Sequence, residues 1–178
     1  KREHEIARLL RSMEEHPERA HLVGAYALGK AQRVIGLLRN AGYDRTIYLH
    51  GAMQRPCALY EERGVPLGPL AHASEATKDE LVGAVVIAPP SALKDRWSRR
   101  FPDPVIAMAS GWMSVKQRAR QRGVELPLVI SDHCDWPELL QSIEDTEAQT
   151  IWVTHGREDA LVYQCRKNGL TAEPLNKI

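Results

Sequence analysis

Continuous apolar runs alternate with amphipathic stretches along almost the whole chain, and this alternation restricts the fold more than any other feature of the sequence. The clearest run extends from Val82 to Ala88, where no polar residue alternates with the apolar ones. A strand of that kind is buried on both faces, as in a parallel sheet covered by helices. We therefore predict an α/β fold with a mostly parallel sheet flanked by helices.

The expected elements alternate as strand and helix, as this fold requires. The predicted strands are 21–28, 46–50, 82–88, 104–109, 128–130, 151–153 and 170–175. The predicted helices are an N-terminal one through Met13, 30–40, 52–63, one carrying Trp97 that Ser91 would cap, and a basic one to about Arg122. Residues 65–75 are rich in Pro, Gly and Ala and are predicted to form a loop.

Composition excludes several classes of protein. A net charge of +1 over 178 residues gives no global attraction for nucleic acid, so such binding would need local basic patches. Two stretches offer them, although most of these residues also fit solvated helix faces: Lys94, Arg96, Arg99 and Arg100, and Lys116, Arg118, Arg120 and Arg122. Three widely spaced cysteines fit neither a disulfide framework nor a Cys-x-x-Cys zinc motif, which favours a reducing, cytoplasmic setting. No apolar run approaches membrane-spanning length and no signal peptide opens the chain, so no membrane association is expected.

Two histidines follow predicted strands near the C-terminal end of the chain. His133 lies in Ser-Asp-His-Cys-Asp-Trp and His155 lies in Thr-His-Gly. Because ligands collect where parallel strands end, the two imidazoles are expected to meet at one sheet edge and to serve metal-assisted or acid–base chemistry. Alternatively, Asp135 is only a helix cap and His155 only a histidine satisfied at a sheet edge. The remaining histidines, His21 among them, are interpreted mostly as surface or loop residues.

Two turns are candidates for binding a phosphate or a base. In Tyr26 to Arg33, Gly29 and Lys30 open a helix, whose free N–H groups and positive end suit an anion. An ordinary strand-to-helix turn is the alternative, and the glycine spacing matches no nucleotide-binding fingerprint. In Ser110-Gly111-Trp112, the indole could stack on a base or simply anchor the loop by packing.

Taken together, these segments resemble the β-CASP nucleases of the metallo-β-lactamase superfamily, and among them the bacterial ligase-associated DNA exonucleases. Tyr-Ala-Leu-Gly-Lys-Ala-Gln (Tyr26–Gln32) is similar to the family's aromatic-Ala-Leu-Gly-basic-x-Gln loop. Ala-Ser-Gly-Trp-Met (109–113) is similar to a second landmark. The two histidine segments resemble the family's Ser-x-His-x-Asp and final histidine elements.

The resemblance implies roles for individual residues. His133 matches the histidine that protonates the leaving oxygen, Asp135 matches the acid two residues later, and His155 matches a zinc ligand. The implied reaction is phosphodiester hydrolysis at a two-zinc centre. The implied nucleic-acid contacts are Gly29, Lys30, Gln32, Ser110, Gly111 and Trp112. The implied partners are DNA, with RNA as a rival substrate, and an ATP-dependent DNA ligase.

One departure from the family is large: the His-x-His-x-Asp-His cluster is absent from the sequence. The chain therefore resembles the C-terminal part of a longer enzyme, with a β-CASP domain at 1–126 and a C-terminal segment of the catalytic domain at 127–178. On this reading the missing N-terminal half completes the zinc centre, and the isolated chain is expected to be inactive. The alternative from a different class is a non-catalytic α/β module that binds a phosphate-bearing ligand.

Overall fold

The computed structural model describes residues 2–115, 117 and 123–175. These residues belong to two compact units, 1–132 and 133–178. The predicted basic helix, with Lys116, Arg118, Arg120 and Arg122, falls largely outside the described residues. The assignment of the two parts of the chain to a β-CASP domain and a catalytic-domain segment stays a prediction.

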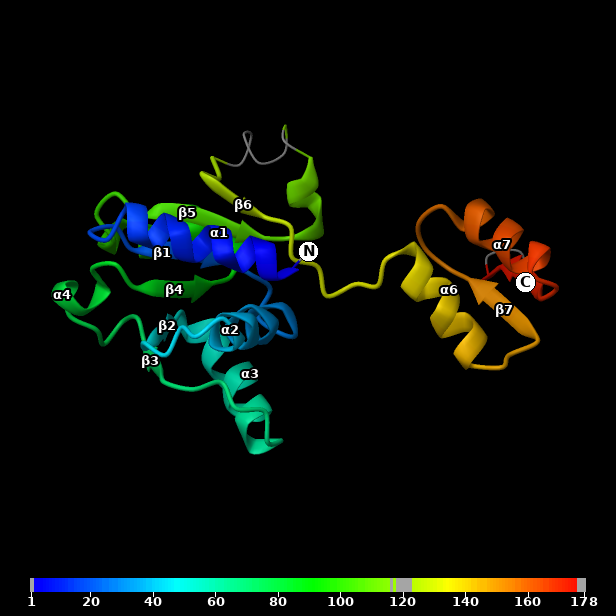
Figure 1. The fold of residues 1–178 in the computed structure, drawn as a ribbon, viewed down its shortest axis with the longest axis horizontal. Coiled ribbons are helices and arrows are strands. Elements are labelled where there is room, and N and C mark those ends of the chain that lie inside the picture. Colours follow the sequence, from blue (N-terminus) through cyan, green and yellow to red (C-terminus); the bar gives the residue numbers. More distant parts are fainter. Residues whose placement is uncertain (1, 116, 118–122, 176–178) are drawn as a thin grey trace. The chain divides into compact units, whose positions relative to one another are not determined.

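The first unit is built on a six-stranded sheet. Its strands are β1 (His21–Gly24), β2 (Ile47–Leu49), β3 (Leu70–His72), β4 (Val85–Ala88), β5 (Val105–Ala109) and β6 (Leu126–Leu128). Its helices are α1 (Arg2–Glu15), α2 (Lys30–Asn40), α3 (Gly51–Glu62), α4 (Lys78–Leu81) and the short 3₁₀ helices η1 (Pro90–Lys94), η2 (Arg96–Arg100) and η3 (Gly111–Ser114). The strand order is β3-β2-β4-β1-β5-β6, and every described pairing in the sheet is parallel (Figure 1). The α/β prediction is confirmed.

The strand order creates a change of direction beside β1. After β1 the chain runs to β2 on one side, whereas after the neighbouring β5 it runs to β6 on the other side. The loops that leave these two strands therefore diverge at their carboxyl ends. In open α/β sheets such a divergence leaves a crevice where ligands bind.

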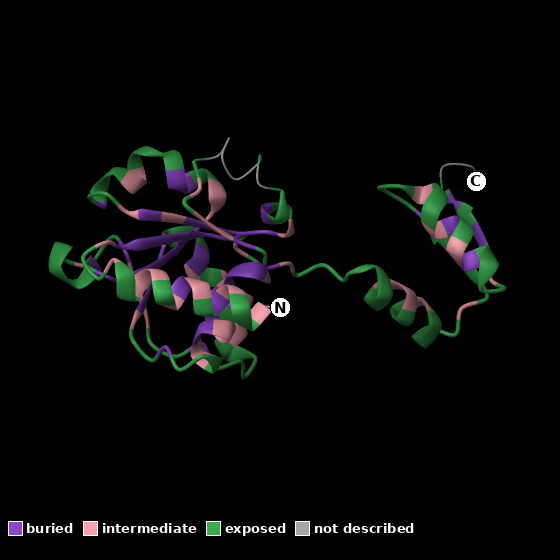
Figure 2. Cartoon of the chain, turned by 45° about the horizontal axis from the view of Figure 1, so that its top comes forward, coloured by how far each residue is buried: buried purple, intermediate pink, exposed green. Residues whose placement is uncertain are grey.

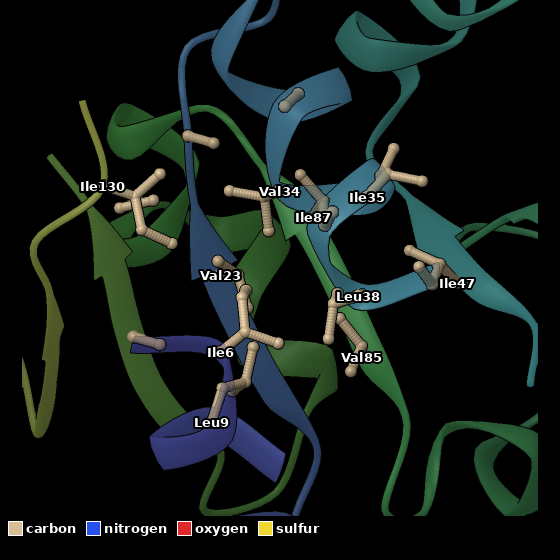
Figure 3. Packing of buried hydrophobic residues seen from close by; sticks show 14 of the residues in the cluster. Ile6, Leu9, Val23, Val34, Ile35, Leu38, Ile47, Val85, Ile87 and Ile130 are labelled. Atoms are coloured by element: carbon tan, nitrogen blue, oxygen red, sulfur yellow. The ribbon is translucent and has the colours of Figure 1, made fainter. Parts of the chain in front are cut away.

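Helices cover both faces of this sheet, as the buried strands require (Figure 2). One core lies between the sheet and helices α1, α2 and α3 (Figure 3). There Ile6 of α1 and Leu38 of α2 pack with Val23 and Val85 of the strands. The alternate strand residues, such as Leu22, belong to a second core on the opposite face. Side chains alternate between the faces of a strand, so one apolar run supplies both cores.

Three predicted elements differ from the structure. Residues 65–75 contain the edge strand β3, too short for any periodicity, which exists because its backbone pairs with β2. The sixth strand is Leu126–Leu128 rather than 128–130, with Pro127 tolerated because β6 is an edge strand. The segment carrying Trp97 forms η1 and η2 instead of one helix, and Pro89 rather than Ser91 precedes η1.

The second unit is smaller. It contains α6 (Trp136–Asp145), β7 (Thr150–Val153), α7 (Glu158–Lys167) and β8 (Thr171–Pro174), which confirms the predicted last strand. Strands β7 and β8 pair in parallel as a separate two-stranded sheet. The core of this unit consists of Val153, Val162, Cys165 and Ala172. Among the helices that the structure describes, none is both long and apolar enough to cross a membrane.

His21 is fully buried at the start of β1, so its interpretation as a surface or loop residue was wrong. Its Nδ1 lies 3.1 Å from the carbonyl oxygen of Arg19, and its Nε2 lies 2.9 Å from the hydroxyl of Ser12. A neutral imidazole satisfies both contacts, donating to the carbonyl and accepting from the hydroxyl. Burial lowers the pKa of His21 below its ordinary value, with smaller contributions from the charges of His16 and Arg19 in the same direction.

This lowered pKa predicts a loss of stability in mild acid. As pH falls below the ordinary histidine pKa, His21 becomes protonated in the unfolded chain but stays neutral in the folded chain. The free energy of unfolding therefore decreases. We expect His21→Gln to flatten the dependence of the melting temperature on pH between about pH 7 and pH 5, whatever its effect at neutral pH. His4→Gln, at an exposed position, is the control. An unchanged slope in His21→Gln would contradict this assignment.

Candidate functional site

Three segments meet at the carboxyl edge of the six-stranded sheet. They follow β1, β5 and β6, and they flank the change of direction beside β1. The Nζ of Lys30 lies 2.9 Å from Oδ1 of Asp132. A Cβ placed on Gly111 would lie 3.5 Å from Oγ of Ser131. Residues 131–132 therefore touch both predicted binding turns, which are about 80 positions apart in the sequence.

The turn before α2 is shaped by Gly29 and Gln32. Gly29 has φ of 83°, a left-handed conformation that favours glycine. Its N–H donates to Oε1 of Gln32 at 2.8 Å, while Nε2 of Gln32 donates to the carbonyl of Ala27 and to Sγ of Cys57. Gln32 is buried, so its side chain holds the turn from inside. The part of Gln32 in nucleic-acid binding stays a prediction.

Lys30 is also buried, with 5% of its side chain exposed. Its charge is offset by the Asp132 carboxylate, and its ammonium lies 5.2 Å from the centre of the Tyr26 ring. Beside it, Nη1 of Arg33 donates to the carbonyl of Ser131 at 2.6 Å. These contacts tie the start of α2 to the segment that precedes His133. In this structure Lys30 binds the protein's own carboxylate, and its contact with a nucleic-acid phosphate stays a prediction.

The second turn presents an aromatic ring. Ser110 is buried and caps η3, because its hydroxyl accepts from the N–H of Trp112 at 3.3 Å. Gly111 lets the turn approach Ser131 closely. The Trp112 side chain is 62% exposed. Its stacking on a base stays a prediction.

Asp135 is a helix cap in the second unit. Its Oδ1 accepts from the N–H of Glu138 at 3.1 Å, and Oε2 of Glu138 accepts from the N–H of Asp135 at 3.0 Å. This reciprocal pair is a capping box, with Pro137 in the first turn. The capping interpretation of Asp135 is confirmed, and its implied catalytic role stays a prediction. His133 is exposed just before this cap.

His155 has an unusual backbone in the second unit. It follows β7 with φ of 67°, in the left-handed region that non-glycine residues seldom adopt. Its Nδ1 lies 3.0 Å from the hydroxyl of Thr154. Histidines that bind a metal through one ring nitrogen typically have a hydrogen-bond partner at the other nitrogen. This arrangement favours the ligand interpretation without testing it.

The expectation that both histidines follow strands of one sheet was wrong. The strand before His133 belongs to the six-stranded sheet, whereas among the described residues the strand before His155 pairs with β8 alone. The two strands have similar apolar patterns. Such a local pattern predicts a strand but does not specify which sheet the strand joins. Among the described residues, no three His, Cys, Asp or Glu side chains gather as a metal-binding group.

Sequence reasoning missed two residues that organise the site, Asp132 and Arg33. Both lie inside segments that the sequence singled out, but their importance comes from contacts about a hundred positions apart. The sequence held one signal for this contact, the opposite charges of Asp132 and Lys30. Both residues follow predicted strands, and they form an ion pair in the structure.

No family model matches this sequence. The chain is similar to a probable DNA ligase of Opitutus terrae, with 28% identity over 147 residues. That alignment covers 83% of this chain and 14% of the ligase. The chain thus corresponds to a small part of a much longer protein that is described as acting on DNA.

Proposed function

We propose that the protein carrying this chain is a zinc-dependent nuclease that hydrolyses phosphodiester bonds at DNA ends, in the cytoplasm and together with an ATP-dependent DNA ligase. One observation carries the proposal. Three of the four segments that resemble β-CASP nucleases lie far apart in the sequence, yet they are joined by the contacts Lys30–Asp132 and Gly111–Ser131. Segments that serve one reaction are expected to be brought together by the fold.

The similarity to a probable DNA ligase supports the choice of DNA and of a ligase as partner. Because this chain aligns with only 14% of that ligase, the similar region is one part of a larger protein. A nuclease that removes damaged nucleotides would prepare DNA ends for sealing by a ligase. RNA remains the rival substrate, since none of the residues above recognises a 2′-hydroxyl.

The proposed zinc centre needs ligands that the described residues do not bring together. We expect His155 to supply one ligand through Nε2 and residues outside this chain to supply the others. His133 is proposed to hold the proton for the leaving oxygen. Asp135 is proposed to position His133 indirectly, because its hydrogen bond with the N–H of Glu138 fixes the backbone at the start of α6.

A comparison of the isolated chain with the whole protein tests the proposal. We expect the whole protein to degrade DNA and to contain zinc by elemental analysis, with activity lost on chelation and restored by zinc. The 178-residue chain is expected to have neither property. Full nuclease activity with stoichiometric zinc in the chain alone would contradict the division of the zinc centre. Degradation of RNA but not DNA would assign the rival substrate.

A second candidate is a non-catalytic module that binds a nucleic acid or another phosphate-bearing ligand. The glycine turn before α2 and the change of strand direction beside β1 favour it, because both are typical of ligand sites in α/β folds. Binding of DNA by a whole protein that never cleaves it would favour this candidate over the nuclease.

A further inference from the structure

Two aromatic side chains are exposed on the neighbouring loops beside the change of strand direction. Tyr26 is 59% exposed and Trp112 is 62% exposed. In the register of β1 and β5, Gly24 pairs with Met108, so Tyr26 lies two residues beyond this pair on one loop and Trp112 four residues beyond it on the other. Adjacent strands thus present two large rings at one edge of the sheet. Exposed aromatic residues gathered in this way mark binding surfaces.

The Tyr26 ring is held by its own loop. The Lys30 ammonium lies 5.2 Å from its centre, and that ammonium is anchored in turn by Asp132. A cation near an aromatic face favours a fixed ring. Because the Lys30 charge is offset by a carboxylate, attraction for a polyanion at this edge has to come from other residues.

Exposed cations lie at the end of, and just after, a helix that packs against the end of β1. Helix η1 reaches the carboxyl end of β1, where a Cβ on Gly24 would lie only 2.6 Å from Cδ1 of Leu93. Lys94 ends this helix and Arg96 begins η2, and both are exposed. Glycine at position 24 therefore lets Leu93 pack against the end of β1, two residues before Tyr26, and the basic residues follow Leu93 in the sequence. Aromatic rings beside cations are the combination that binds single-stranded nucleic acids.

We propose that Tyr26 and Trp112 form a stacking surface for unpaired bases, with Lys94 and Arg96 attracting the phosphates of the same strand. This inference rests on the proposed function and names the form of its substrate as an unpaired strand end. A duplex conceals the faces of its bases, whereas a single strand exposes them to aromatic side chains. A protein partner would need no free bases, so the test below separates the two occupants.

Fluorescence anisotropy of the 178-residue chain with labelled oligonucleotides tests the inference. The probes are a single strand, a blunt hairpin of the same sequence, and an abasic strand of the same length. We expect the single strand to bind most tightly. Trp112→Ala and Tyr26→Ala should each weaken that binding about 5- to 150-fold, and Trp112→Phe should stay within about threefold of the natural chain.

Trp152→Ala is the matched control. Trp152 is 63% exposed, as Trp112 is, but it lies in the second unit on β7. Its replacement is expected to leave single-strand binding unchanged. Thermal unfolding of each variant shows that the fold is retained, which the exposure of all three side chains favours.

Several results would overturn the stacking surface. If Trp112→Ala bound the single strand as tightly as Trp152→Ala does, Trp112 would have no part in binding. If the abasic strand bound as tightly as the single strand with bases, stacking on bases would not contribute. Equal affinity for the blunt hairpin would remove the preference for unpaired ends. If the whole protein still cleaves DNA in those cases, the nuclease proposal survives without this inference. Specific stacking in a protein that never cleaves would support the surface and contradict the nuclease.

Discussion

Replacing His133 by alanine in the whole protein is expected to lower the rate of DNA cleavage about 10²- to 10⁴-fold while the zinc content stays the same. The reason is that His133 is proposed to donate a proton to the leaving oxygen and not to bind metal. It lies exposed directly before the capped start of α6, so removing its ring should leave the cap of Asp135 and Glu138 in place. Turnover at saturating DNA and zinc by elemental analysis are the two measurements.

His155→Ala is the matched variant, because its expected signature is different. We expect zinc content to fall along with activity, since the Nε2 of His155 is proposed as a ligand. Thr154→Val, which removes the hydroxyl 3.0 Å from Nδ1, should lower zinc affinity by about 10- to 100-fold. Equal loss of metal in His133→Ala and His155→Ala would reject the division of roles between the two histidines.

Replacing Asp132 by asparagine is expected to destabilise the first unit by about 3 kcal/mol, because it leaves the buried Lys30 ammonium without its counter-charge. This value lies at the lower end for a buried pair, since Asp132 keeps 29% of its side chain exposed. The measurement is the free energy of unfolding of the 178-residue chain in urea. The transition of the first unit has to be followed separately from that of the second.

A double-mutant cycle isolates the pair. Lys30→Met combined with Asp132→Asn should cost less than the sum of the single variants, with a coupling of about 0.5 to 3 kcal/mol. Glu75→Gln is the control, because its ion pair with His72 is exposed on both sides and should contribute about 1 kcal/mol or less. Additive effects of the Lys30 and Asp132 variants would contradict the ion pair as the anchor of the segment before His133.

The same cycle has a consequence for binding. If Lys30 contacted a phosphate directly, Lys30→Met would weaken DNA binding while Asp132→Asn would strengthen it, because the freed ammonium would gain access to the anion. If Lys30 acts by holding the loop, both variants should weaken binding in proportion to their loss of the Tyr26 loop conformation. The geometry, with the ammonium buried against Asp132, favours the second outcome.

The elements whose signals are local could be predicted from the sequence. Helix α2 begins at Lys30 and ends at Asn40 as expected, because one apolar stripe and a left-handed glycine at position 42 define it locally. Apolar runs without alternation predicted buried parallel strands for the same reason. Three-residue strands such as β3 show no such pattern and depend on a neighbour in the sheet.

The sequence alone determined the α/β alternation, the main helices, and the residue types that lie where strands end. Only the tertiary structure decided the strand order, the burial of His21, and the assignment of the two histidine segments to strands of different sheets. It also revealed the ion pair between Lys30 and Asp132. Periodicity records which face of an element is buried, whereas contacts between residues a hundred positions apart depend on how the elements are ordered in the sheet.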